Sequence, residues 1–255
     1  MSAAAVEVSR ASRGWRRFRR NPTAAIGLAI VVVVVFAAVF APWISPYPDH
    51  VGAVVNFRAR YQPPSVHFWF GADNVGRDIL TRVLFGYRIS LILAVTVLGI
   101  AVPVGVVLGL VAGYFGGWVE TVVMRVNDIA LAIPPLVMTL AVTTVLTPSL
   151  IHSMLAIAAL WWTWHTRLIF SIVRTLRQQE FVEAAVTLGA SRSHILFREL
   201  LPNCASAILV KTSLDFGFVI LVGAALSYLG LGVQPPTPDL GTMVASGADF
   251  LPDHW

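Results

Sequence analysis

Residues 24–40 read AAIGLAIVVVVVFAAVF, an unbroken apolar run without a charged side chain. A helix needs about 20 mostly apolar residues to cross the hydrocarbon core of a bilayer. We therefore expect a first transmembrane helix over residues 24–41. Positive charge tends to stay on the cytoplasmic side of a membrane, so residues 1–23 are predicted to be a cytoplasmic segment. That segment ends in a cluster of arginines: Arg16, Arg17, Arg19 and Arg20.

A cleaved signal peptide is the alternative interpretation of this N-terminal region. The apolar run is long for the core of a signal peptide, and Pro42 directly follows Ala41, which makes a poor cleavage site. These two features favour an uncleaved membrane anchor.

The composition excludes an ordinary soluble domain. Hydrophobic residues make up 57% of the chain and charged residues 12%, whereas soluble domains carry about 25% charged residues. The net charge of +5 comes from arginines that cluster between apolar runs, which indicates membrane topology rather than nucleic-acid binding. The single cysteine, Cys204, permits no intrachain disulfide.

Four further apolar runs predict an all-α, polytopic bundle of five spans with its C-terminus outside. Residues 42–88 form a predicted extracytoplasmic loop, although its arginines are more numerous than the charge rule prefers. Within that loop, Ile79–Tyr87 is expected to be a short interfacial helix. The remaining residues, 89–255, form the core of the bundle. The four runs are residues 89–111, 118–146, 150–173 and 205–228.

Small residues recur every four positions in the second predicted span. Such a stripe lets another helix approach closely, and it is a packing feature rather than a binding site. The stripe consists of Ala101, Gly105, Gly109, Gly113 and Gly117.

Polar residues interrupt the later spans. Arg125 and Asp128 are three apart in the third span and are a possible intramembrane pair, or they anchor the helix at the cytoplasmic interface. The third span is expected to kink or break at Pro134-Pro135. In the fifth span, Lys211 and Asp215 are four apart and can also pair. His152 and His165 in the fourth span have no metal-binding partners nearby in sequence and are interpreted as packing or interface residues.

The loop over residues 174–203 is predicted to be cytoplasmic and to form a helix, a glycine turn and a second helix. Gly189 suits a left-handed helix end, Ser191 or Ser193 can cap the second helix, and Pro202 is expected to end it. Small and apolar side chains on this element suit docking into a groove of a soluble partner, while an amphipathic element lying on the membrane is the alternative. The candidate docking residues are Glu183, Ala184, Ala185, Gly189, Ala190, Ser191, Ile195, Leu196, Leu201 and Pro202.

Four segments in order resemble the permeases of ABC importers, and specifically the C-type subunits for dipeptides, oligopeptides and nickel. Glu183-Ala184-Ala185 with Gly189 and Leu201-Pro202 is similar to the family's E-A-A loop. The stretches WRRFRRNP at 15–22 and LSYLGLGVQPP at 226–236 resemble further family segments. The fourth segment, GADNVGRDILTR at 71–82, resembles an extracytoplasmic motif through Gly71, Asp73, Gly76, Arg77, Asp78 and Arg82.

The resemblance implies the transmembrane fold of a type I ABC importer in a bacterial cytoplasmic membrane. It also implies the partners: a second permease subunit, two ATPase subunits that receive the E-A-A loop, an extracytoplasmic solute-binding protein, and membrane lipid. ATP and Mg²⁺ are expected on the ATPase subunits, with no cofactor or metal on this chain. Two positions, Glu199 and Leu240, depart from the family pattern, and the sixth span that the family carries has no counterpart here.

Nothing in the sequence predicts covalent catalysis. The only lysine, Lys211, follows Val210 where a P-loop needs glycine. The main alternative function is a secondary transporter or channel driven by an ion gradient, for which Arg125 and Asp128 are the candidate groups. A membrane scaffold that recruits proteins through residues 181–201 is a third alternative. The sequence leaves dipeptides, longer peptides, glutathione-like molecules and metal complexes open as substrates.

Overall fold

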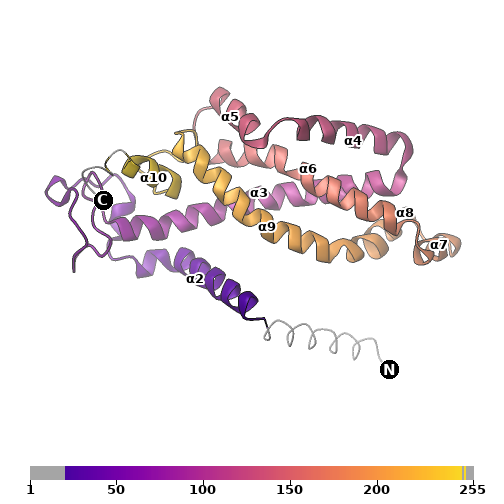
Figure 1. Ribbon diagram of the computed structural model, residues 1–255, viewed down its shortest axis with the longest axis horizontal. Coiled ribbons are helices and arrows are strands. Elements are labelled where there is room, and N and C mark those ends of the chain that lie inside the picture. The colour runs from indigo at the N-terminus through magenta and orange to yellow at the C-terminus, as the bar shows by residue number, and fades with distance from the viewer. Residues whose placement is uncertain (1–20, 249, 251–255) are drawn as a thin grey trace.

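The computed structural model describes residues 21–248 and 250, and this part of the chain is built from helices, with one isolated bridge between Ala72 and Asp78. Three long helices run side by side along the molecule (Figure 1): α3 (Ile79–Phe115), α6 (Leu150–Leu176) and α9 (Leu201–Tyr228). The predicted all-α bundle is therefore confirmed. The arginine cluster at residues 16–20 lies outside the described residues.

The first predicted span is helix α2 (Pro22–Ile44), capped by the side chain of Asn21. It extends beyond the expected end at residue 41 and includes Pro42. Only 11% of its most apolar window is buried, because α2 packs along one side of α3 and leaves most of its apolar surface exposed (Figure 1).

Helix α3 contains the second predicted span and extends beyond it at both ends. Asp78 caps it by accepting a hydrogen bond from the N–H of Thr81 at 2.8 Å. The prediction of a separate interfacial helix over Ile79–Tyr87 is wrong, because these residues form the first turns of α3 without interruption. The cap at Asp78, which sequence reasoning overlooked, marks the true start.

The glycine stripe of α3 lets α6 approach to backbone contact, as predicted. A Cβ atom added at Gly105 would lie 2.5 Å from the carbonyl oxygen of Trp162, and one at Gly109 would lie 2.7 Å from that of Thr166. A Cβ atom at Gly113 would lie 2.9 Å from the side chain of Val173 and 3.1 Å from the carbonyl oxygen of Phe170. Gly117 does not belong to this stripe, since it lies beyond the end of α3 at a φ of +57° with open space around it.

The third predicted span is broken into α4 (Gly117–Ala132) and α5 (Pro135–Val145), which are bent by 84°. The residue before a proline is disfavoured in the α-helical region, so the helix ends ahead of Pro134-Pro135. The predicted break at this position is confirmed.

Among the described residues, three helices are long and apolar enough to cross a membrane, or four if the bent pair α4 and α5 is one span. The fourth predicted span, α6, is 27 residues long, but it is less apolar than these helices and is not among them. Its central indoles, His165 and Arg167 lower its hydropathy. It lies between α3, α4, α5 and α9, where His165 is fully buried and Arg167 stays half-exposed.

Short elements gather at the two ends of the bundle (Figure 1). One end carries α7 (Glu180–Thr187) and α8 (Arg192–His194), followed by the π-helical turn η3 (Ile195–Leu200). The opposite end carries the 3₁₀ turns η1 (Pro48–Val51) and η2 (Phe57–Ala59) together with α10 (Leu240–Ala248). The E-A-A loop and the motif over residues 71–82 thus lie far apart, at opposite ends of the long helices.

Candidate functional site

The predicted helix, glycine turn and second helix are present at the α7 end, and we call residues 180–200 the elbow. Gly189 has a φ of +78° and its N–H donates to the carbonyl oxygen of Val186 at 3.0 Å. Ala190 donates to Ala185, also at 3.0 Å. Ser191 caps α8 by accepting a hydrogen bond from the N–H of His194. The left-handed glycine is what reverses the chain between α7 and α8.

One side of the elbow is anchored in the bundle. Val182, Ile195, Leu196 and Leu200 are buried with residues of α3 and α6 in one hydrophobic cluster. We expected Ile195 and Leu196 to face a partner, and this is wrong, since they are 1% and 7% exposed. The sequence shows that this helix has an apolar side, but it does not show whether that side packs into the bundle or faces a partner.

The other side of the elbow projects into the surroundings. Leu188 is 87% exposed and Val186 54% exposed, and both lie beside the exposed Glu183 and Ala184. Exposed apolar side chains at the tip of a protruding element are typical of a surface that docks against another protein.

The second helix of the elbow does not end at Pro202. The chain is helical from Arg192 to Tyr228, and Pro202 lies in the first turn of α9. The N–H of Leu201 bonds to the carbonyl oxygen of Leu196, five residues back. A π-helical turn of this kind accommodates a residue without an N–H inside a long helix, so the elbow continues rigidly into the fifth predicted span.

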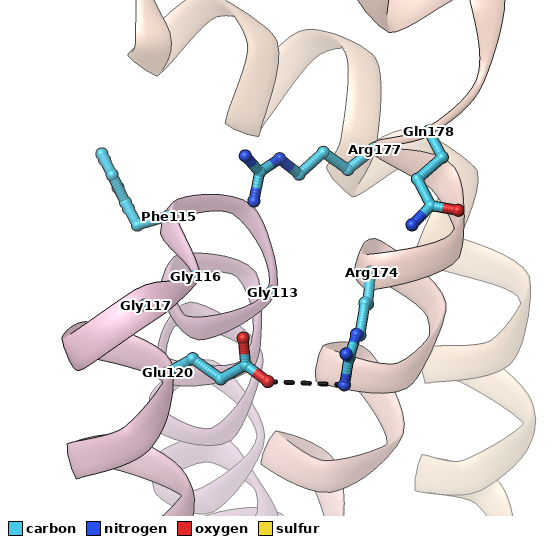
Figure 2. A pocket seen from close by; sticks show the side chains of 8 residues that line it. All are labelled: Gly113, Phe115, Gly116, Gly117, Glu120, Arg174, Arg177 and Gln178. Carbon is cyan, nitrogen blue, oxygen red and sulfur yellow. Dashed lines mark hydrogen bonds and ion pairs between the residues drawn. The ribbon is translucent and has the colours of Figure 1, made fainter.

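A cavity of about 480 Å³ lies beside the elbow, between the α3–α4 turn and the end of α6 (Figure 2). Arg174 donates to Glu120 at 3.4 Å across it, and Arg177 points toward the turn at Gly116. The guanidinium of Arg192 lies 5.6 Å from the ring of Phe115. Three arginines, Arg174, Arg177 and Arg192, therefore lie at the same end as the elbow.

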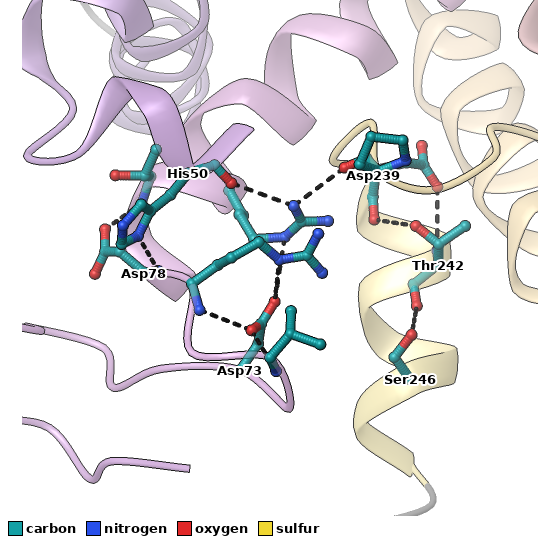
Figure 3. A network of polar contacts seen from close by, with 11 residues as sticks. His50, Asp73, Asp78, Asp239, Thr242 and Ser246 are labelled. Carbon is teal, nitrogen blue, oxygen red and sulfur yellow. Dashed lines mark hydrogen bonds and ion pairs between the residues drawn. The ribbon is translucent and has the colours of Figure 1, made fainter. Parts of the chain in front are cut away.

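At the opposite end, the motif over residues 71–82 folds around the carboxylate of Asp73 (Figure 3). This carboxylate accepts hydrogen bonds from the backbone N–H groups of Val75 and Arg77, and it lies 2.8 Å from Nε of Arg77. Two glycines make the turn possible. Gly71 and Gly76 have φ values of +78° and +83°, and a Cβ at Gly76 would overlap the carbonyl oxygen of Asn56 at 1.9 Å.

Asp78 and Arg82 are four positions apart, a spacing that predicts a local ion pair, and the structure contradicts this prediction. Asp78 caps α3, and its N–H donates to Nδ1 of His50. Arg82 lies 3.7 Å from Asp73 instead and donates to the carbonyl oxygens of His50 and Pro236. A capping aspartate directs its carboxylate at the helix N-terminus, away from a side chain one turn later.

A second cavity, of about 570 Å³, lies between this motif and α10. Asp73, Arg77 and Arg82 line one side, and Thr242 and Ser246 line the other. Asp239 caps α10 through the N–H groups of Gly241 and Thr242 (Figure 3). Burial raises the pKa of the Asp239 carboxyl above its ordinary value. Within residues 21–248 and 250, no group of three or more His, Cys, Asp or Glu side chains is arranged to hold a metal.

Polar side chains also meet in the middle of the bundle. Asp128 forms its ion pair with Arg167 of α6 rather than with Arg125, so the possible pair within α4 is not formed. The predicted pair of Lys211 and Asp215 is confirmed. The buried His165 lies 3.6 Å from Asp215, a contact between α6 and α9 that the sequence spacing gave no means of finding.

Comparison with known proteins agrees with these features. The chain matches the family described as the binding-protein-dependent transport system inner membrane component over residues 105–251. Residues 9–64 match the N-terminal TM domain of oligopeptide transport permease C.

Individual relatives are similar over most of their length. The probable D,D-dipeptide transport system permease protein of Escherichia coli is 38% identical over 92% of this chain and 78% of the relative. The di/tripeptide transport system permease protein of Pseudomonas aeruginosa is 38% identical over 94% and 80%, respectively. The oligopeptide transport system permease protein of Bacillus subtilis is 38% identical over 92% and 76%. This chain therefore belongs to the family of binding-protein-dependent transport system inner membrane components and is a multi-pass permease subunit of an ABC importer.

Proposed function

We propose that this chain forms the translocation pathway for di- or oligopeptides, together with a second permease subunit, in a bacterial cytoplasmic membrane. Two separate ATPase subunits supply the energy and hold the ATP and Mg²⁺. An extracytoplasmic solute-binding protein delivers the peptide, and lipid surrounds the complex. The printed names of the similar permeases, which refer to dipeptides and oligopeptides, support this substrate class.

The observation that carries the proposal is the construction of the elbow. Its tip is exposed at Leu188, while Val182, Ile195 and Leu200 anchor it among side chains of α3 and α6. Because packed interiors change between discrete arrangements rather than deform gradually, a displacement of the tip is transmitted to the long helices. ATP-driven closure of the ATPase subunits is the source of that displacement.

The elbow end is assigned to the cytoplasm and the motif over residues 71–82 to the outside. The start of α2 points toward the elbow end (Figure 1), so a cytoplasmic N-terminus is consistent with this orientation. The outer cavity beside Asp73 and Arg82 then faces the solute-binding protein. Since Glu183 and Ala184 are exposed within one helical turn of Leu188 or just beyond it, we assign them to the ATPase-facing surface as well.

The test is co-purification of the ATPase subunits with the chain from membranes, combined with uptake of a labelled dipeptide. Leu188→Asp places a charge at the exposed tip and is expected to release the ATPase subunits and abolish uptake. The matched control is Val66→Asp at the opposite end, where the side chain is 89% exposed, and it is expected to retain the ATPase subunits. Retention of both ATPase binding and uptake in Leu188→Asp contradicts the proposal. Uptake that continues without ATP supports the gradient-driven alternative.

A further inference from the structure

A layer of charged side chains crosses the bundle at one level. Asp128 of α4 pairs with Arg167 of α6, and Lys211 pairs with Asp215 on α9. His165 of α6 contacts Asp215 at 3.6 Å. Because His165 and Arg167 are two positions apart, the two groups are separated by about 3 Å along α6. The layer holds two carboxylates and two permanent cations, so its formal charges balance.

This layer lies deep in the predicted membrane region. At 1.5 Å per residue, Asp128 is about 16 Å along α4 from Gly117, and Arg167 is about 13 Å from the end of α6 at Leu176. The hydrocarbon core of a bilayer is about 30 Å thick. Both measurements place the layer near the middle of the membrane.

The two halves of the layer differ in exposure. On the α9 side, His165 and Asp215 are 0% and 2% exposed, which is typical of a buried structural contact. On the α4 side, the side chains of Arg167 and Asp128 are 51% and 47% exposed. Charged groups at this depth face protein or water rather than lipid, because exposure to hydrocarbon costs several kcal/mol.

Asn127, the residue before Asp128, also indicates that this part of α4 has a polar role. Asn127 is fully buried, and neither amide atom has a hydrogen-bond partner among the described residues. Unpaired buried polar groups are costly and are retained chiefly where they have a function. This part of α4 therefore holds three polar side chains, Arg125, Asn127 and Asp128, within one helical turn.

We propose that Asp128 and Arg167 line the aqueous pathway at mid-membrane depth and bind the terminal ammonium and carboxylate groups of a peptide. This inference rests on the peptide-import function proposed above. A guanidinium binds a carboxylate through two parallel hydrogen bonds, and a carboxylate accepts from an ammonium. Because half-exposed ion pairs contribute little stability, a zwitterionic peptide can separate Asp128 from Arg167 at low cost and replace each partner.

The first experiment measures water access and does not depend on transport. The only cysteine, Cys204, is buried, so a Cys204→Ser background is suitable for introducing single thiols. Arg167→Cys in the assembled transporter is expected to react with a membrane-impermeant thiosulfonate, because the reactive thiolate requires water, and a dipeptide is expected to slow the reaction. The control is Val33→Cys on α2, a 64% exposed apolar position, which is expected not to react. Equal reactivity at the two positions overturns the proposed pathway location.

The second experiment measures KM for three peptides: a free dipeptide, its C-terminal amide and its N-acetyl derivative. Arg167→Gln is expected to raise KM about tenfold or more for the free dipeptide and leave the C-terminal amide unchanged, because loss of a charged hydrogen bond has an effect of this size. Asp128→Asn is expected to raise KM for the free dipeptide by a similar factor and to leave KM for the N-acetyl derivative unchanged. Arg88→Gln, at an exposed position of α3, is the control and leaves all three values unchanged.

The reversed pair, Asp128→Arg with Arg167→Asp, separates binding from structure. It keeps the ion pair between α4 and α6, so membrane abundance is expected to equal that of the wild type while KM for the free dipeptide rises. Restoration of both abundance and KM by the reversed pair shows a purely structural role and overturns the proposal. A wild-type complex that imports no peptide refutes the proposed function and peptide binding here, whereas the thiol experiment still decides whether Arg167 faces water.

Discussion

Nη1 of Arg82 donates a hydrogen bond to the carbonyl oxygen of Pro236 at 3.2 Å, across 154 positions of the chain. The same guanidinium contacts Asp73 and the carbonyl oxygen of His50. A single buried side chain at the start of α3 thus joins the loop before it to the loop after α9. Arg82 also lines the cavity between residues 71–82 and α10.

Arg82→Gln is expected to destabilise the outer end by about 1–3 kcal/mol, because it leaves buried acceptors of the arginine without their charged donor. The measurement is the midpoint of thermal unfolding of the purified chain in detergent. Arg88→Gln, at an exposed position of the same helix, is expected to change stability by no more than about 0.5 kcal/mol. Equal shifts for the two variants contradict the role assigned to Arg82.

Gly189→Ala is expected to impair coupling, since an L-residue in the left-handed region costs about 1–2 kcal/mol and the elbow turn depends on that conformation. The readout is peptide-stimulated ATP hydrolysis by the reconstituted complex. Gly230 is a close control, because it has the same φ of +78° and the same open surroundings at the opposite end. Gly230→Ala is expected to cost similar stability and leave the stimulation intact. Similar losses of stimulation in both variants mean that strain alone, not the elbow, explains the effect.

Gly109→Ala is expected to separate α3 from α6, because its Cβ would lie 2.7 Å from a backbone oxygen of α6 that has little freedom to move. Overpacking of this kind costs about 1–3 kcal/mol. Gly99→Ala is the control on the same helix, where nothing lies within 4 Å of the added methyl group, and it is expected to be neutral or to stabilise by up to about 1 kcal/mol. Denaturant unfolding in mixed micelles measures both, and the reverse order refutes the packing argument.

Asp239 is expected to make the outer end more stable as the pH falls. Burial raises its pKa in the folded chain, so the folded state binds the proton more tightly than the unfolded state does. The stabilising contribution is complete below the unfolded pKa, near 3.9, and is lost as the pH rises through the raised folded pKa. Thermal unfolding of the chain between pH 4 and pH 8 measures this dependence.

Asp239→Asn is the matched variant for that titration. Asparagine still caps a helix but does not titrate, so α10 is retained and the contribution of this residue to the pH dependence disappears. Asp239→Ala removes the cap and is expected to cost about 1 kcal/mol at pH 7. A pH profile that is the same in wild type and Asp239→Asn contradicts the assignment.

Local features of the sequence predicted most of the helices and the elbow. The apolar run before Pro42, the break at Pro134-Pro135 and the turn at Gly189 each follow from steric or solvation rules that act within a few residues. The glycine stripe at Gly105 and Gly109 predicted a close helix contact but not its partner, because spacing along one helix says nothing about which helix packs against it.

Two of the differences between sequence and structure concern which of several chemically similar partners a side chain selects. Asp78 could either cap α3 or pair with Arg82. It caps the helix, because the extended backbone at Asp78 places the carboxylate over the first turn of α3. Asp128 found Arg167 on another helix rather than Arg125 on its own. Pro202 was accommodated because a π-helical turn precedes it.

The sequence by itself determined that the chain crosses a membrane as helices, where those helices begin to bend, and which segment forms the elbow, because these properties depend on neighbours in the chain. Only the tertiary structure decided that Arg82 meets Pro236, that Ile195 faces inward and that Arg167 pairs with Asp128. Those contacts join residues far apart in sequence, and the packing of whole helices fixes which side chains come within reach of one another.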